Sequence, residues 1–536
     1  MTVMQRVLWL VTIPGNLAGI MAWELGFSPW WLVLTVTYTL VGSYDYLCSH
    51  HTLNRLYPVV AYIRYVLEFI RPEIRQYFIA SNTDEKPFNR EMRSLIYQRA
   101  KAVRDTKAFG TERNLYERGF LSANHALVPV VVCQQSCRVT VGGTDCLQPY
   151  SASRLNISAM SYGALSANAI RALNGGAMMG GFAHNTGEGG ISPYHLEAGG
   201  DLIWQIGSGY FGCRDDSGNF CPESFKENAR RAEVKMIEIK LSQGAKPGHG
   251  GVLPAAKITQ EVSEIRGIPM GQDCISPAAH SAFHSPKGLL KFIKQLRELS
   301  EGKPVGFKLC VGRKEDVMAI IKAMLEMRIL PDFITVDGAE GGTGAAPVEL
   351  TNHMGLPCIE GTYFLHNCLV GARLRKDIRI ISSGITASGF NVLTKLAVGA
   401  DMVNAARSMM MAMGCIQSRA CNTNHCPTGI ATQDPVRSKA LNVTSKRERV
   451  AHYHKATMES CFSLIGAMGI NDVNKLCPSH ILQRTHDGLA VPFDSIHPSL
   501  KEGELLGKKI NDSFSLFWER ASADSFKAIS EVFHKQ

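Results

Sequence analysis

The stretch DFITVDGAEGGTGAAP, residues 332–347, joins a run of mostly apolar residues to a loop rich in glycine. A short apolar run with β-branched residues is typical of a strand that is buried on both faces of a parallel sheet. The acid Asp337 and four glycines follow, and glycine lets a backbone approach a planar ligand closely. We interpret the loop as a ligand-binding segment, with a flexible surface loop as the alternative.

Further β-rich runs lie on both sides of this stretch, and longer helical segments separate them. They read RLNISAM (154–160), IEIKLS (237–242), VGFKLCV (305–311), IRIISSG (378–384) and DMVNAAR (401–407). Continuous apolar strands that alternate with helices indicate parallel βα units. Gly384 and residues 404–407 end two of these strands, where a (β/α)8 barrel commonly forms its phosphate cradle. We therefore expect an α/β fold, with a (β/α)8 TIM barrel at residues 151–435.

The N-terminal segment is strongly apolar. Residues 7–23 and 25–44 carry no charge and are separated by Glu24. Each run is roughly long enough to cross a bilayer core of about 30 Å. Arginines flank the pair on both sides, and tryptophans lie near the expected interfaces. We predict a transmembrane hairpin at residues 1–50 in the inner membrane, with the catalytic domain in the cytoplasm. The alternative is two buried helices of a soluble domain.

Two further regions complete the expected organisation. Residues 51–150 form a helical linker and barrel-entry region, within which residues 54–78 are amphipathic. That segment is expected either to lie along the membrane surface, in contact with lipid, or to be an ordinary packed helix. Residues 436–536 are expected to be a C-terminal helical extension.

The charge and cysteine content exclude other classes. The chain has 57 Lys and Arg against 47 Asp and Glu, a formal charge of +10, but no basic run with interleaved aromatics, so we expect no nucleic-acid partner. Fifteen cysteines without a cleavable signal peptide disfavour a disulfide framework. Three of them, Cys415, Cys421 and Cys426, lie within a dozen residues, and three thiolates on a short loop suit a soft metal cluster.

Five motifs occur in an order that resembles the FMN-binding synthase domain of glutamate synthase. They are MSYGALS (160–166), NTGEGG (185–190), KLSQGAKPGHGG (240–251), DGAEGGTGA (337–345) and CIQSRACNTNHCPTGIATQDP (415–435). The resemblance covers about 155–435. The segment PFNREMRSLIYQRAK (87–101) is similar to free-standing members of the family that carry a membrane-associated N-terminus.

The resemblance implies an FMN site and an iron–sulfur cluster. The spacing C-x5-C-x4-C-P is that of a [3Fe–4S] cluster, whose three iron corners Cys415, Cys421 and Cys426 would bind. Lys308 would lie near the N1 side of the flavin. The other residues implied around FMN are Met160, Ser161, Gly163, Gln243, Asp337, Gly341, Gly342, Thr343, Gly384, Ala406 and Arg407.

The activity implied is reductive amination of 2-oxoglutarate with ammonia to L-glutamate, with hydride from reduced FMN. Lys246 matches the substrate-binding lysine of the family, and Glu188 its proton-handling glutamate. The cluster would relay electrons from a donor protein, either ferredoxin or a partner that oxidises NAD(P)H. The chain begins Met1-Thr2 rather than with the nucleophilic cysteine of an amidotransferase, so ammonia is expected from solution or from another protein.

Two positions depart from the family pattern as we align it. Tyr210 stands where an arginine is expected and Val252 where a glutamine is expected, and both family residues help to hold the oxo-acid. We therefore expect weak binding of 2-oxoglutarate unless another cation, such as Arg214 or His249, compensates. The first alternative is a membrane-tethered FMN and iron–sulfur oxidoreductase that acts on another 2-oxo acid, imine or amino acid. The second is an inactive binding or scaffold protein, which the intact motifs disfavour.

Overall fold

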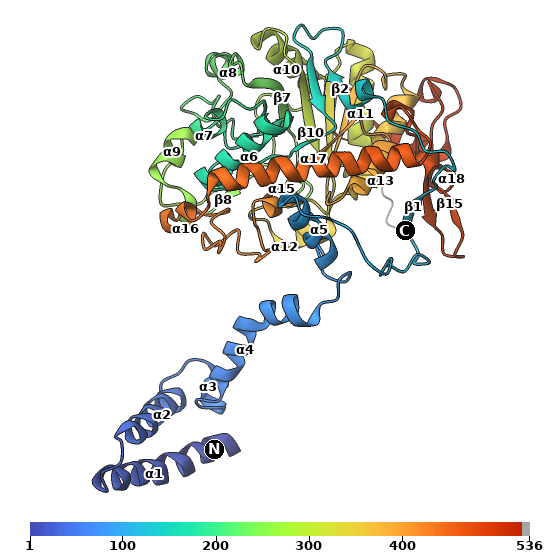
Figure 1. Cartoon of the computed structure of the whole chain (residues 1–536). Helices are drawn as coiled ribbons and strands as arrows, with labels where there is room; N and C mark the ends of the chain where they lie inside the picture. Colours follow the sequence, from blue (N-terminus) through green and yellow to red (C-terminus); the bar gives the residue numbers. More distant parts are fainter. Residues whose placement is uncertain (528–536) are drawn as a thin grey trace, which may run out of the picture. The chain divides into compact units, whose positions relative to one another are not determined.

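The computed structural model describes residues 1–527 and divides into two units, Met1–Arg90 and the rest of the chain from Glu91. The larger unit is built on a closed barrel of eight strands (Figure 1). All neighbouring strands are parallel, and they follow one another around the barrel in chain order, which confirms the predicted (β/α)8 fold. The strands are β4 (Leu155–Ile157), β5 (His184–Asn185), β6 (Leu202–Ile206), β7 (Val234–Lys240), β10 (Val305–Leu309), β11 (Phe333–Asp337), β12 (Arg379–Ser383) and β13 (Met402–Ala405).

Helices surround the barrel (Figure 1). Several begin at a serine whose hydroxyl accepts a hydrogen bond from a backbone N–H three residues on, as Ser166, Ser285 and Ser388 do. The helices that follow the barrel strands are α6 (Ala167–Gly180), α7 (Pro193–Leu196), α8 (Pro222–Ala229), α10 (Pro286–Leu299), α11 (Lys314–Met327), α12 (Val348–His353), α13 (Cys358–Gly371), α14 (Gly389–Ala397), α15 (Arg407–Ala412), α16 (Pro435–Lys439) and α17 (Val443–Ala467).

A β-hairpin closes the amino-terminal mouth of the barrel. It consists of β2 (Arg138–Val141) and β3 (Tyr150–Ser153), which pair antiparallel. Val141 and Ala152 of the hairpin pack with Ile203, Phe333 and Met402, which lie at or near the starts of barrel strands. With this end filled by apolar side chains, a ligand has access at the carboxyl ends of the strands.

The region after residue 435 is not helical throughout. The long helix α17 packs along α6, as predicted for a helical extension (Figure 1). Beyond it, β14 (Ile481–Arg484) and β15 (Ala490–Pro492) form a small antiparallel sheet with β1 (Leu121–Ala123). The prediction of an all-helical extension is therefore wrong for these residues, whose strands are too short for a clear periodicity. The remaining helices of the larger unit are α5 (Arg90–Ala100), α9 (Gln260–Arg266), α18 (Phe493–Ile496) and α19 (Asp512–Arg520).

The smaller unit contains the predicted helical hairpin. Helices α1 (Val3–Glu24) and α2 (Trp30–Leu47) run antiparallel, because Gly42 lies against Leu8 and the Asn16 amide donates to Thr39 Oγ1 at 2.7 Å. Within residues 1–527, α1 alone, with 22 residues, is long and apolar enough to span a bilayer. Membrane insertion of the pair stays a prediction.

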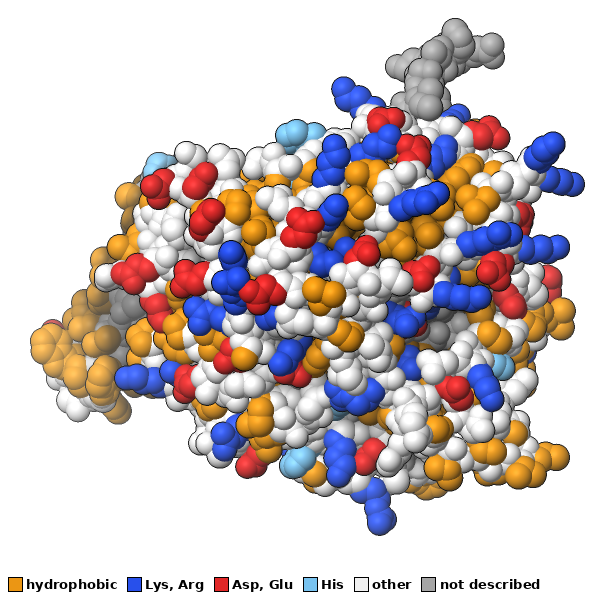
Figure 2. Space-filling view, turned by 90° about the horizontal axis from the view of Figure 1, so that it is seen from above, with side chains coloured by type: hydrophobic (Ala, Val, Ile, Leu, Met, Phe, Trp, Pro, Cys, Tyr) orange, Lys and Arg blue, Asp and Glu red, His pale blue; other side chains and the backbone are white. Residues whose placement is uncertain are grey.

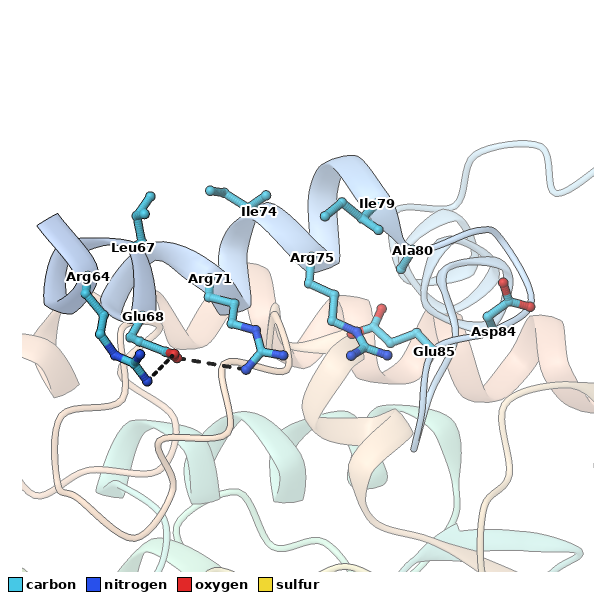
Figure 3. Close-up of a pocket in the computed structure, with 10 residues that line it drawn as sticks. All are labelled: Arg64, Leu67, Glu68, Arg71, Ile74, Arg75, Ile79, Ala80, Asp84 and Glu85. Atoms are coloured by element: carbon cyan, nitrogen blue, oxygen red, sulfur yellow. Dashed lines mark ion pairs between the residues drawn. The ribbon is translucent and has the colours of Figure 1, made fainter.

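The helices after the hairpin are α3 (Thr52–Leu56) and α4 (Ala61–Ile74), and α4 continues into a π-helical turn, Arg75–Ile79. As predicted, α4 is amphipathic. Figure 3 shows Leu67 and Ile74 on one side of it and Arg64, Arg71 and Arg75 on the other, along a cavity of about 600 Å³. Glu68 pairs with Arg64 and Arg71 at 4.0 and 3.8 Å.

Acidic and basic side chains are mixed on one face of the molecule. Figure 2 shows Lys and Arg interspersed with Asp and Glu on the face seen from above.

The close contact of α6 with α17 gives a prediction about stability. A Cβ built on Gly176 would lie 2.7 Å from the Val450 side chain and 2.8 Å from Arg447 O, so Gly176→Ala should lower the free energy of unfolding by about 1–3 kcal/mol. Gly175→Ala is the control, because its nearest neighbours are Arg447 side-chain atoms at 3.3 Å that can move. Urea unfolding followed by tryptophan fluorescence measures both. Equal stability of the two variants would contradict this view of the interface.

Candidate active site

The carboxyl ends of β7, β10 and β11 bring the predicted flavin-site residues together. Asp337 ends β11 and accepts a hydrogen bond from Gly244 N at 2.9 Å, and its Oδ2 lies 3.8 Å from Lys308 Nζ. Gln243 Nε2 donates to Gly342 O at 2.8 Å. The glycine-rich loop is thus fixed to the lysine motif, as expected if residues 337–345 bind a ligand. Lys308 is 4% exposed, so its pairing with a carboxylate reduces the cost of burying its charge.

A group of buried charges lies beside this loop. Glu188 Oε1 pairs with Lys240 Nζ at 2.6 Å, and the side chains are 18% and 7% exposed. Burial acts to raise the pKa of Glu188, but Lys240, then Lys246 and Arg266, outweigh it and hold the pKa at about 2. Burial, with the charge of Lys240, lowers the pKa of Lys246 to about 8. Glu188 is therefore a carboxylate at neutral pH, whereas Lys246 can exchange a proton close to neutrality.

Arg266 is a member of this group that the sequence analysis missed. It ends α9, within an insertion whose strands β8 (Val252–Leu253) and β9 (Cys274–Ile275) pair antiparallel. The side chain is 5% exposed, Nη2 donates to Tyr162 O at 2.9 Å, and Nε has no hydrogen-bond partner. An arginine in the last turn of a helix, just before a glycine such as Gly267, is usually exposed and interacts favourably with the helix dipole. The local sequence therefore does not indicate that Arg266 belongs to a binding site.

The MSYGALS motif forms the loop after β4. Met160 N donates to Asn185 O at 3.0 Å, and Gly163 has φ of 98°, a conformation that favours glycine. A Cβ on Gly187 would lie 3.0 Å from Ser161 N, so this loop and the turn before Glu188 are in contact. The predicted residues Met160, Ser161 and Gly163 therefore lie at the same end of the barrel as Glu188.

The predicted phosphate-binding residues follow adjacent strands. Gly384 comes directly after β12, and Ala406 and Arg407 after β13, which pairs with β12. Arg407 Nη2 donates to Glu340 O, and a Cβ on Gly342 would lie 2.7 Å from the Arg407 side chain. These contacts join the predicted phosphate-binding residues to the glycine-rich loop. Gly341 N donates to Gly338 O, and Thr343 Oγ1 and Lys246 Nζ both donate to Ala345 O, at 3.1 Å each.

Tyr210 does not line a substrate pocket, so that prediction is wrong. The side chain is fully buried in the apolar core, and its hydroxyl accepts from Ala282 N at 3.1 Å and bonds His280 Nδ1 at 3.0 Å. A phenol can be accommodated in this aromatic core in a way that a guanidinium could not. Val252 begins β8 beside Gly251, where a Cβ would lie 2.5 Å from Glu188 Oε1.

The three predicted metal-binding cysteines share one loop near the MSYGALS loop. Cys421 and Cys426 interact electrostatically with each other, with Cys415 and with buried Lys257. Lys257 Nζ donates to Ala164 O at 2.9 Å, so the loops are neighbours. No group of three or more His, Cys, Asp or Glu side chains within residues 1–527 stands in a metal-binding arrangement. The cluster stays a prediction.

The closed barrel with a charged site at the carboxyl ends of its strands defines a (β/α)8-barrel protein of enzyme type. Residues 91–471 match the family model described as a conserved region in glutamate synthase. The chain belongs to the glutamate synthase family, as the sequence motifs predicted, and its relatives imply an oxidoreductase.

Individual relatives agree with this assignment. The chain is 36% identical over 489 residues to the glutamate synthase large subunit-like protein YerD of Bacillus subtilis, covering 84% of this chain and 93% of the relative. It is 38% identical over 325 residues to the archaeal-type glutamate synthase (NADPH) of Thermotoga neapolitana, 60% of each chain. Among solved structures, the flavin-binding domain of baker's yeast flavocytochrome b2 shares 12% identity at a TM-score of 0.41, over 87% of this chain and 93% of that one, which is too distant to bear on function.

The buried ion pair gives a prediction with a pH dependence. Glu188→Gln should lower the free energy of unfolding by about 3–5 kcal/mol at pH 7, because it leaves the Lys240 ammonium buried without its partner. The pKa of Glu188 is lowered on folding, so the carboxylate contributes stability above its ordinary pKa of 4.5. The difference in free energy of unfolding between the wild type and Glu188→Gln should therefore become smaller as the pH falls from 4.5 towards about 2.

Urea unfolding at several pH values measures this difference. Glu197→Gln is the control, because Glu197 pairs with Arg171 at 2.7 Å but is 57% exposed, and its loss should change stability far less. A Glu188 variant as stable as the wild type at pH 7 would show that the pair contributes nothing.

Proposed function

We propose that the protein is an FMN-dependent glutamate synthase that reductively aminates 2-oxoglutarate with ammonia to L-glutamate. The observation that carries this is the buried group of Glu188, Lys240, Lys246 and Arg266 beside the glycine-rich loop. Three cations against one carboxylate leave an excess positive charge, which favours a dianionic substrate. Membership of the glutamate synthase family supports the same activity.

The residues at the barrel mouth fit FMN. A Cβ on Gly244 would lie 1.7 Å from Gly338 O, so the two loops approach each other through bare backbone and leave a flat, glycine-lined edge. Lys308 would stabilise negative charge on the reduced ring, and Arg407 with the N–H groups after Gly384 would hold the phosphate. When bound, FMN would supply the hydride that reduces the imine.

The protein's own groups bind the substrate and move protons. The Nε of Arg266 has no partner in the described structure and can donate to a substrate carboxylate. Lys246, with a pKa of about 8, can give a proton to the oxygen that leaves as water when ammonia adds to the keto carbon. Glu188 stays ionised and can accept a hydrogen bond from the incoming ammonium, while Lys240 holds it in place. The neutral form of Lys246 can take the proton of the ammonium, and this is the proton that it gives to the leaving oxygen. The overall reaction converts 2-oxoglutarate, ammonia and two reducing equivalents into glutamate and water.

Electrons would reach the site through the cysteine loop. We propose that Cys415, Cys421 and Cys426 bind a [3Fe–4S] cluster, which the C-x5-C-x4-C-P spacing supports, and that a ferredoxin or NAD(P)H-oxidising partner reduces it. The contacts of Lys257 and of Gln433, whose Nε2 donates to Gly163 O at 3.0 Å, link this loop to the MSYGALS loop. That proximity would suit electron relay.

The N-terminal unit is proposed to tether the enzyme to the inner membrane. The exposed side chains of α1 and α2 are mainly apolar, with Trp23, Trp30 and Trp31 each more than half exposed. Thr2 Oγ1 donates to Leu56 O at 3.0 Å, so the start of α1 and the segment after α2 lie together. Both ends of the hairpin would then face the cytoplasm, with α4 along the lipid surface.

The proposed activity predicts a direct reaction. Protein loaded with FMN and chemically reduced should be reoxidised anaerobically when 2-oxoglutarate and ammonium are both added, and glutamate should appear in proportion to the flavin. Pyruvate and oxaloacetate are the comparison substrates. The excess of buried cations favours the two dicarboxylates over pyruvate, and oxaloacetate tests the dependence on chain length. Glutamate detected by mass spectrometry is the measurement. Equal or faster reoxidation by another oxo-acid would favour the alternative substrate class, which Val252 supports.

Arg266→Met in the same assay tests the binding role. Loss of a desolvated, charge-assisted bond of about 1.5–3 kcal/mol should raise KM for 2-oxoglutarate by about 10 to 150-fold. Arg214→Met is the matched control. Both arginines lie over the Phe211 ring, Arg214 at 5.7 Å and Arg266 at 5.2 Å from its centre. Only Arg266, however, is among the cations that lower the pKa of Glu188. A similar effect of both variants would remove Arg266 from the site.

A further inference from the structure

A carboxylate in the interior of the barrel has no part in the chemistry described above. Glu238 lies on β7, is fully buried, and points among the strands beneath the site. Its Oε1 accepts from Asn185 Nδ2 at 2.8 Å and from Gln205 Nε2 at 2.7 Å, and its Oε2 accepts from Thr335 Oγ1 at 2.5 Å. Within residues 1–527 no Lys, Arg or His lies within ion-pair distance of it. Two amides and one hydroxyl, all neutral donors, therefore hold this buried carboxyl group.

The donors come from three other strands. Asn185 is on β5, Gln205 on β6 and Thr335 on β11, so the carboxylate of Glu238 connects four strands of the barrel through its interior. A carboxylate can only accept hydrogen bonds, and it therefore determines how each amide is turned. Both NH2 groups face Glu238, and the amide oxygen of Asn185 is directed elsewhere.

That amide oxygen supports the turn that carries Glu188. Asn185 Oδ1 accepts from Gly187 N at 3.0 Å, and Gly187 has φ of 65°. Gln205 N donates to Thr186 Oγ1 at 3.1 Å, so the second amide residue holds the same turn from β6. The backbone of Asn185 also accepts from Met160 N at 3.0 Å. Of the three groups bound by Glu238, the Asn185 amide therefore supports the turn through its side chain, whereas Gln205 supports it through its backbone N–H.

We propose that Glu238 is a positioning residue, which sets the orientation of the Asn185 amide and through it the place of Glu188 in the active site. The inference rests on the proposed function for its effect on rate, but not for its effect on structure. With methionine at position 238, the NH2 group of Asn185 would lose its acceptor. Asn185 would then be free to turn over, and the acceptor for Gly187 N would be lost. A glutamine would keep the arrangement, because its Oε1 can accept from both amides and its NH2 can donate to Thr335 Oγ1.

The variants Glu238→Met and Glu238→Gln test this arrangement. Methionine has a similar length but no strong acceptor, so it removes the partner of both amides. Glutamine is the conservative control, because its Oε1 can accept from Asn185 Nδ2 and Gln205 Nε2 and its NH2 can donate to Thr335 Oγ1. Hydrogen exchange of the peptide containing residues 186–190 is the first readout. Loss of the Gly187 bond should speed its exchange by about tenfold in Glu238→Met, whereas Glu238→Gln should stay close to the wild type.

Kinetics is the second readout. In the glutamate assay, Glu238→Met should lower kcat by about 10 to 100-fold, with KM for 2-oxoglutarate changed by less than about threefold, because a misplaced Glu188 affects the reaction more than binding. Asp332→Asn is the control: Asp332 is equally buried, but it binds Arg297 and Val305 N at the amino-terminal end of the barrel. It should leave the exchange of residues 186–190 unchanged.

The outcomes separate this inference from the proposed function. If exchange at 186–190 is unchanged in Glu238→Met, or if Glu238→Gln speeds it as much as Glu238→Met does, the positioning role is wrong whatever reaction the enzyme catalyses. If exchange responds as expected and no oxo-acid is reduced even by the wild type, the proposed function fails and the positioning role stands. A rise in KM with kcat unchanged would also overturn the role given to Glu238.

Discussion

The bond between Lys240 and Glu188, at 2.6 Å, is the interaction on which the rest of the site depends. Lys240 ends a strand, whereas Glu188 lies in a glycine-bounded turn that follows another. The pair keeps an ionised carboxylate among Lys246 and Arg266, which would otherwise leave several buried cations without a counter-charge. Because Glu188 partly offsets these charges, the group stays positive enough to attract a dicarboxylate and neutral enough to be buried.

The barrel supplies the rigidity that this charge group needs. Its amino-terminal mouth is filled by an apolar hairpin, and its interior carries the polar network around Glu238. Loops that follow neighbouring parallel strands must meet at one end, which explains how motifs far apart along the chain, such as 160–166 and 337–345, come to lie around one site. The site is therefore built from loops, but each is anchored to a strand.

Much of the fold could be predicted from the sequence, because six of the eight barrel strands lie in the apolar runs that the sequence analysis found, although the run of β6, Leu202–Ile206, was missed. The strand His184–Asn185 offered no such signal, since it has two residues and both are polar. The ion pair of Glu188 with Lys240, and the place of Arg266, depend on tertiary packing and follow from no local pattern. Tyr210 shows the reverse error: alignment placed it in the pocket, whereas its ring packs in the core and its hydroxyl bonds His280.

The central claim is that buried cations, among them a lysine of lowered pKa, hold a dicarboxylate substrate. The most direct test is the dissociation constant of 2-oxoglutarate from the oxidised, FMN-loaded protein, followed by flavin absorbance across pH. Lys246 has a pKa of about 8, so affinity should be constant below that pH and weaken by up to about tenfold per pH unit above it. An affinity that is the same at pH 7 and at about pH 9.5 would contradict the account.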